Sequence, residues 1–104
     1  MSAPQPAAKD PIRVDAQHYK VEFENSRVRV LRTTYGPHEK SVMHTHPALI
    51  GVMLTGGHAR FTMPDGQVQE VELKPGEVMS FDATEHLPEN IGDTTFEAIL
   101  VELK

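Results

Sequence analysis

Residues 18–32, HYKVEFENSRVRVLR, alternate between apolar and polar side chains on both sides of a central Asn-Ser pair. A period of two places successive side chains on opposite faces of a β-strand, so each half is typical of a half-buried strand. Asn and Ser are common turn residues, and the whole stretch therefore predicts a β-hairpin. We expect its first strand to bury the side chains of Tyr19, Val21 and Phe23.

Short strands separated by turns continue to the end of the chain. Apolar or alternating runs cover residues 49–54, 58–63, 68–73, 78–81 and 96–103. The separating turns contain proline and glycine, most clearly the Pro-Asp-Gly and Pro-Gly turns that precede the third and fourth of these runs. No helical period of 3.6 residues is sustained anywhere. Eight or nine short strands predict an all-β fold, either a sandwich or a small barrel.

Length and composition set the remaining limits. A chain of 104 residues has the size of one domain, which we place at residues 18–104. Residues 1–17 begin with three prolines among small side chains, and we expect them to form a flexible N-terminal segment. The net charge of −5 argues against a nucleic-acid partner, and no apolar run is long enough for a membrane helix. The lack of cysteine excludes disulfides and thiolate zinc sites, and it is compatible with a cytoplasmic location.

His44 and His46, in the stretch SVMHTHP, raise the question of a metal site. Six histidines produce an H-x-H by chance in roughly one shuffled chain in three, so the motif alone is weak. On a strand, however, both side chains point to one face about 6–7 Å apart, from which two imidazole nitrogens can reach one ion. Val42 shares that face, which indicates that the pair points toward the core. A hydrogen-bonded pair without metal is the alternative.

Two stretches of the chain resemble the motifs of the cupin superfamily. His44, His46 and Gly56 match positions of the first motif, and His86 with Asn90 matches the H-x-x-x-N of the second. The resemblance covers nearly the whole chain, because the number and order of the strands are also similar. The chain also looks like a group of small single-domain cupins that have no assigned reaction.

The motifs depart from the family pattern at several positions. The leading glycine of the first motif is displaced to Gly36, and its glutamate is absent, because that place falls at Leu49 or Ile50. The proline and glycine usual before the second-motif histidine are replaced by Phe81 and Ala83. The fold assignment is unaffected, whereas the chemistry becomes harder to assign.

The resemblance implies a small cupin-type β-barrel, that is, a double-stranded β-helix or jelly roll. It also implies one divalent transition metal held by His44, His46 and His86. Such a neutral three-histidine site is similar to that of cysteine-dioxygenase-like and diketone-cleaving cupins, and imidazole suits iron, zinc, nickel and copper alike. Three functions remain open: a metal-dependent enzyme of dioxygenase or isomerase type, a non-catalytic module that binds a small ligand, and a metal-free structural barrel.

Four further residues are candidates for contacting a substrate or supporting the ligands. His38 and Glu39 precede the metal strand in a loop that could reach the barrel mouth, and His58 lies on the polar face of its strand. Glu85 adjoins the third histidine. Ordinary loop or surface positions are the alternative for all four, and we expect His18 to be exposed at a strand start.

Two expectations concern the rest of the molecule. Asn90 is interpreted as a turn former rather than a metal ligand. Small cupins commonly form homodimers, so the resemblance implies a homodimer. We expect its surface to include the N-terminal segment and the strand at residues 19–23, with no nucleic acid or membrane as a partner.

Overall fold

The computed structural model describes residues 8–104. Within these residues one short helix, α1 (Pro11–Val14), precedes nine strands. The strands are β1 (Tyr19–Glu24), β2 (Val28–Tyr35), β3 (His44–His46), β4 (Leu49–Met53), β5 (Gly57–Thr62), β6 (Val68–Leu73), β7 (Val78–Phe81), β8 (Thr84–Asn90) and β9 (Phe96–Leu103). The all-β prediction and the expected number of strands are confirmed.

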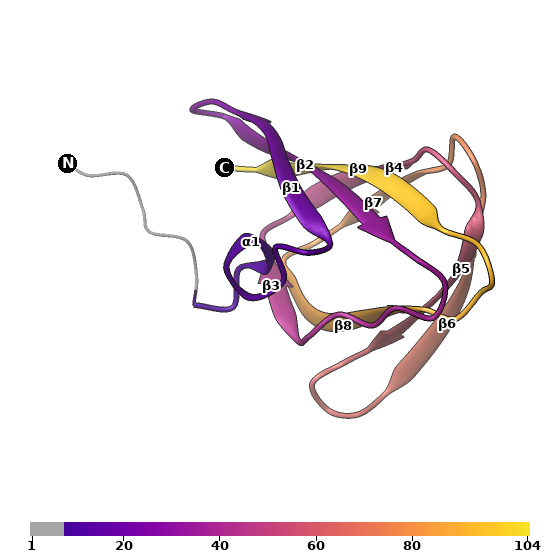
Figure 1. Cartoon of the computed structure of the whole chain (residues 1–104). Coiled ribbons are helices and arrows are strands. Elements are labelled where there is room, and N and C mark those ends of the chain that lie inside the picture. Colours follow the sequence, from indigo (N-terminus) through magenta and orange to yellow (C-terminus); the bar gives the residue numbers. More distant parts are fainter. Residues whose placement is uncertain (1–7) are drawn as a thin grey trace.

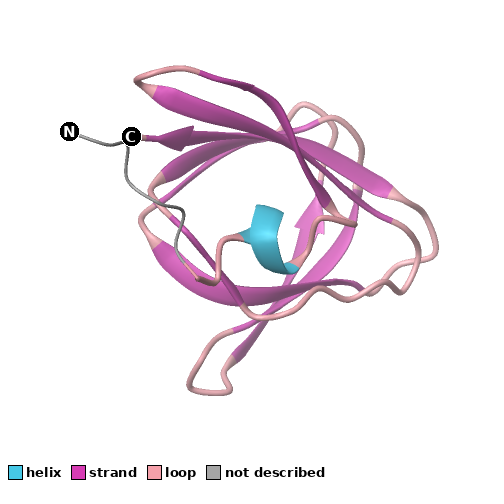
Figure 2. Cartoon of the chain, turned by 60° about the vertical axis from the view of Figure 1, so that its left-hand side comes forward, coloured by secondary structure: helices cyan, strands magenta, loops and turns pink. Residues whose placement is uncertain are grey.

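The strands form two antiparallel sheets that curve around a shared interior (Figure 1). One sheet has the order β1-β2-β9-β4-β7 and the other the order β3-β8-β5-β6. Figure 2 shows the ring of strands with α1 over its centre, and α1 contacts β1 and β3. The molecule is therefore a double-stranded β-helix barrel rather than a flat sandwich.

The predicted turns join the strands in two ways. The Asn25 carboxamide oxygen accepts hydrogen bonds from the backbone N–H groups of Arg27 and Val28, and this turn closes the β1–β2 hairpin. Gly66, which has a positive φ of 89°, closes the β5–β6 hairpin. Gly76 also has a positive φ, but its turn leads from β6 to β7, which belong to different sheets.

One face of each long strand points into the barrel. The buried core consists of Tyr19, Leu31, Tyr35, Met53, Ala59, Leu73, Phe96 and Ala98. Register keeps these faces together, since Leu31 lies opposite Leu100 and Tyr35 lies opposite Phe96 across the β2–β9 pair. The core therefore brings β2 and β9 together at the centre of the larger sheet.

The predicted buried face of β1 is correct only at Tyr19. Val21 is 38% exposed and Phe23 is 53% exposed. The β1–β2 register shifts between these two residues, and β1 is an edge strand with a partner on one side only. The alternation in the sequence is real, but the irregular register turns Phe23 away from the core.

The predicted flexible segment at residues 1–17 is described only in part, because residues 1–7 lie outside the described residues. In the described part, α1 packs against β1 and β3 at the barrel end. The Asp10 carboxylate accepts from the Ile12 N–H, and Pro11 occupies the first turn, so Asp-Pro is the start signal of α1. The Lys9 carbonyl accepts from the Thr45 N–H at 2.9 Å, which ties this segment to β3.

Asn90 ends β8 and is fully buried. Its amide nitrogen donates to the carbonyls of Tyr35 and Thr94 at 3.0 and 2.8 Å, and its oxygen accepts from the Gly92 N–H. Every contact is to backbone, so Asn90 shapes the turn after β8 and anchors it to β2, as expected for a turn former.

Candidate metal centre

Three histidines meet on the inner wall of the smaller sheet. In the antiparallel β3–β8 pair, His44 lies directly opposite His86, and His46 lies two residues further along β3 on the same face. One ring nitrogen of each residue lies within 4.8 Å of the others. The three rings are nearly perpendicular to one another, with centroids 4.8–5.1 Å apart. Strand period and register together thus bring the three side chains to one point.

Hydrogen bonds orient two of the rings. The His44 Nδ1–H donates to the Val42 carbonyl at 2.9 Å, and the His46 Nδ1–H donates to the Glu102 carboxylate at 2.8 Å. A neutral imidazole that carries its proton on Nδ1 keeps a lone pair on Nε2. Both lone pairs are therefore directed into the cluster. The Val42 side chain is 47% exposed, so the prediction that it shares the buried face is wrong, because β3 begins only at His44.

The positions and hydrogen-bond partners of the three Nε2 atoms fit a divalent transition metal. The Nε2 atoms of His44 and His46 lie 3.1 Å apart, and when both rings are neutral with the proton on the hydrogen-bonded Nδ1, no proton lies between them. The Nε2 atom of His86 is buried and has no hydrogen-bond partner. Facing or orphaned lone pairs in a desolvated site are unfavourable, and a cation among them removes that penalty. Three imidazole nitrogens suit iron, zinc, nickel and copper.

Burial keeps two of the rings neutral, which is the form that ligates a metal. Desolvation, followed by the positive charge that His46 can carry, lowers the pKa of His44 to about 4. Desolvation, with His46 and His44 as the next causes, lowers the pKa of His86 to about 3. Both rings therefore offer free lone pairs at neutral pH.

An inward-facing charge network holds His46 in place. Glu102, on β9, is buried and lies opposite Arg29 in the β2–β9 register. The Arg29 guanidinium donates to Glu102 at 2.8 Å and to Asp10, just before α1, also at 2.8 Å. Sequence reasoning missed all three residues. The available signal was the second of two glutamates in the largely apolar run at residues 96–103.

A second network supports His44 and includes His18. The expectation that His18 is exposed is wrong. His18 is buried, stacks on Tyr35 at 4.3 Å, and donates from Nδ1 to the Asp15 carboxylate at 2.8 Å. Its Nε2 lies 3.2 Å from the Glu39 carboxylate. The Ser41 hydroxyl donates to Asp15 and lies 3.2 Å from the Nδ1 of His44, so polar contacts run from Glu39 to the cluster.

Tyr19 places a hydroxyl group beside the Nε2 atoms of the cluster. Its OH group lies 3.2 Å from the Nε2 of His44 and 2.8 Å from the OH of Tyr35. Burial raises the pKa of both tyrosines well above the usual value, with Tyr35 adding to the effect at Tyr19. Both phenols therefore stay protonated and available as hydrogen-bond donors beside the histidines. The alternation around Tyr19 in the sequence predicts only that its ring packs in the core.

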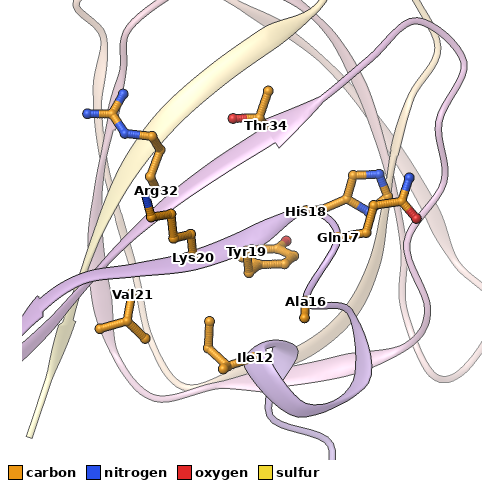
Figure 3. Close-up of a pocket in the computed structure, with 9 residues that line it drawn as sticks. All are labelled: Ile12, Ala16, Gln17, His18, Tyr19, Lys20, Val21, Arg32 and Thr34. Atoms are coloured by element: carbon orange, nitrogen blue, oxygen red, sulfur yellow. The ribbon is translucent and has the colours of Figure 1, made fainter.

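A cavity of about 510 Å³ lies inside the barrel, with His46 and His86 in its wall. Tyr19, Tyr35 and Thr33 line it near the histidines, and most of the remaining wall is apolar. A second, open depression of about 470 Å³ lies between α1 and β1, lined by residues such as Ile12 and Lys20 (Figure 3). None of the three clustered histidines borders this second depression.

Comparison with known families decides the assignment. The sequence profile of the Cupin domain family matches residues 31–102. The chain belongs to the cupin family. Among curated proteins, no sequence matches it.

Solved cupin structures share the fold of this chain. A cupin domain from Bordetella pertussis Tohama I is 26% identical, with a TM-score of 0.76, covering 83% of this chain and 91% of its own. An RmlC-like cupin family protein from Methanocaldococcus jannaschii is 18% identical, with a TM-score of 0.65, covering 86% and 83%. An oxalate oxidase is 18% identical, with a TM-score of 0.55, covering 71% of this chain and 40% of its own. The likeness to the last two concerns the fold alone.

This cupin has no glutamate at the usual place in the first motif. Leu49 occupies the inner face of β4, where it is buried and lines the cavity. Glu102 lies opposite Leu49 across the β4–β9 pair, but its carboxylate contacts Nδ1 of His46, on the far side of the ring from Nε2. Glu102 therefore supports a histidine rather than replacing the missing ligand.

The four weaker candidates do not line the cavity of the cupin barrel. His38 lies in an exposed loop 2.9 Å from Asp93, and the His58 side chain is 60% exposed. Glu85 pairs with Lys9 at 2.6 Å on the outside of β8. Glu39 is 41% exposed and reaches the cluster only through the contacts of His18.

No helix within residues 8–104 has the length and apolarity needed to cross a bilayer.

The lowered pKa values of His44 and His86 predict how stability depends on pH in the metal-free protein. Histidine in the unfolded chain titrates near 6.5, so below this pH the unfolded chain binds protons that the folded cluster excludes. We expect the unfolding free energy of chelator-treated protein to fall by on the order of a few kcal/mol between pH 6.5 and 4. Urea denaturation across this range measures it.

The control separates the two histidines from the carboxylates that also titrate below pH 5. The double variant His44→Gln, His86→Gln retains those carboxylates and should show a shallower decline. Parallel curves for the two proteins would contradict the assignment of buried, neutral histidines.

Proposed function

We propose that this cupin is metal-dependent, with His44, His46 and His86 holding one divalent transition metal through their Nε2 atoms. The observation that carries the proposal is the arrangement of those atoms: two lie 3.1 Å apart on rings whose Nδ1 atoms contact hydrogen-bond acceptors, and the third is buried without a partner. A small molecule binds beside the ion in the barrel cavity. When bound, the ion supplies Lewis-acid polarisation of a chelating ligand and, if it is iron, redox chemistry with oxygen.

The residues of this chain support an oxidative reaction better than an isomerisation. Isomerisation needs a group that removes and returns a proton, and His38, Glu39 and Glu85 all lie outside the cavity. Among the described residues that line the cavity, none is Asp or Glu. Tyr19, a protonated donor beside His44, is suited to holding an oxygen atom of a substrate. We therefore infer a dioxygenase-like oxidoreductase.

A non-catalytic module that binds a small ligand is the second candidate. The same lack of a cavity carboxylate favours it, because ligand binding needs no acid or base. An oxygen electrode separates the two functions. Iron-loaded protein should consume oxygen with a diketone, a thiol or a flavonol, whereas bound metal without oxygen consumption for any of the three supports the module.

Metal analysis tests the site itself. Protein purified under metal-replete conditions should carry about one transition-metal ion per chain, and His44→Ala and His86→Ala should each lose it, because each removes one of three ligands. Elemental analysis by mass spectrometry measures the content. His58→Ala, an exposed histidine on the outside of the barrel, is the matched control and should retain the ion. Wild-type protein that carries no transition metal after purification under metal-replete conditions would contradict the proposal.

Glu102→Gln refines the same experiment. The amide is similar in size but weakens the acceptor that orients His46, so metal affinity should fall by about 10–100-fold while all three ligands remain. A competition titration with a chelating dye measures the affinity. An unchanged affinity would contradict a supporting role for Glu102.

We also propose that the protein forms a homodimer through the outer face of the larger sheet. Val21 and Phe23 are exposed on the edge strand β1. From Phe23 an apolar row continues across the sheet through Val30, Val101 and Ile50, which lie opposite one another in register. An exposed edge strand beside an apolar row is a common site of self-association.

The absence of cysteine supports a cytoplasmic location.

Phe23→Glu tests this surface, since it places a charge in the middle of the proposed contact. Sedimentation equilibrium should show a dimer for the wild type and a monomer for the variant. Val68→Glu adds the same charge at an exposed apolar residue of the other sheet and should stay dimeric. A monomeric wild type at micromolar concentration, or a dimeric Phe23→Glu, would contradict the proposal.

A further inference from the structure

The cavity has two chemically different parts. Near the histidines it is bordered by the hydroxyl groups of Tyr19, Tyr35 and Thr33. Phe61 stacks on His86, and the rest of the wall is largely apolar and includes Met53, Leu73, Met79, Phe96 and Leu100. A ligand that fills both parts has one polar end and an apolar body.

Fixed charge is missing from the wall. Among the described residues that line the cavity, none is Asp, Glu, Lys or Arg. Both cavity tyrosines are protonated, because burial raises their pKa values. A second charged group on a ligand would therefore be desolvated without a partner, which is strongly unfavourable. The cavity accepts one charge, at the histidine end.

Thr33 adds an independent observation that points to a ligand. It is buried on the inner face of β2, opposite Tyr19 in register, and it lines the cavity. Its hydroxyl has no well-aligned hydrogen-bond partner, and it lies close enough to the Tyr19 hydroxyl to lower the pKa of that group. Buried hydroxyl groups are normally satisfied, so the Thr33 and Tyr19 hydroxyls form a pair that can donate to an oxygen atom of a ligand. Tyr19 can donate to the same oxygen-bearing group from the neighbouring strand.

The size and opening of the cavity suit a small molecule. Its volume of about 510 Å³ falls within the range of ligand pockets. It reaches the surface where Gln69, on β6, and Ser80 and Phe81, on β7, are exposed. These two strands are edge strands of different sheets, with no pairing between them. An apolar chain can therefore extend from the histidines toward this opening.

We propose that the cavity binds small monocarboxylates with an apolar body. This inference rests on the proposed function, since the carboxylate head is attracted to an ion whose charge three neutral imidazoles leave uncompensated. The hydroxyl groups of Thr33 and Tyr19 donate to the carboxylate, and the apolar wall buries the chain. Dicarboxylates are excluded by the lack of a second charged partner, and amines by the positive charge of the ion and the lack of a carboxylate in the wall.

Hexanoate and adipate test the ligand class, because they share a carbon chain and differ in the second carboxylate. Calorimetric titration of zinc-loaded protein should give an affinity for hexanoate at least about tenfold higher than for adipate. Equal affinities, or no binding of either compound to protein that demonstrably holds zinc, would overturn the inference. Protein that holds no metal would instead refute the proposed function, so the two failures are distinguishable.

Two substitutions locate the binding within the cavity. Met79→Glu places a charge in the apolar wall and should weaken hexanoate binding at least about tenfold, with unchanged zinc content. Val78→Glu adds the same charge at the neighbouring exposed residue and should leave binding unchanged. Thr33→Val keeps the shape of the side chain and removes the hydroxyl, so it should weaken hexanoate binding several-fold without affecting the fold. Unchanged affinity in both Met79→Glu and Thr33→Val would place hexanoate outside the cavity.

Discussion

The buried contact between Glu102 and Arg29 connects the fold to the histidine cluster. Both residues face inward from the central strands of the larger sheet, where a carboxylate without a partner would be strongly destabilising. Arg29 compensates the charge, and Asp10 satisfies the outer side of the guanidinium. The same carboxylate accepts a hydrogen bond from the Nδ1–H of His46 and so directs the Nε2 atom of His46 toward the other two rings. Removing Glu102 would disturb the barrel wall and the orientation of His46 together.

Much of the architecture was predictable because its signals are local. The period of two and the turn residues identified the strands at residues 68–73, 78–81 and 96–103 with the bounds that the structure has. The H-x-H pair was also within reach, since residues two apart on a strand share a face. His86 joined this pair only through the resemblance to cupins, because its register opposite His44 is a property of the folded sheet.

The remaining features depend on contacts between distant parts of the chain. Alternation does not say which face of a strand is inside, and the inner face of β2 carries Arg29 while Val30 faces outward. A charged residue on an inner face is predictable only when its partner is known, and Glu102 lies 73 residues away. His18 was expected at the surface because nothing near it in the sequence indicates that Asp15 and Tyr35 enclose it.

The histidine cluster and the residues around it come from different parts of the chain, and the segment before β2 supplies some of the surrounding residues. The three histidines lie within the residues that match the Cupin domain family, whereas Tyr19 and Asp15 precede them. The histidine cluster therefore comes from the shared part of the barrel, and part of its surroundings comes from a segment outside it. Two cupins with the same three histidines can thus present different donors to a bound molecule while their barrels stay alike.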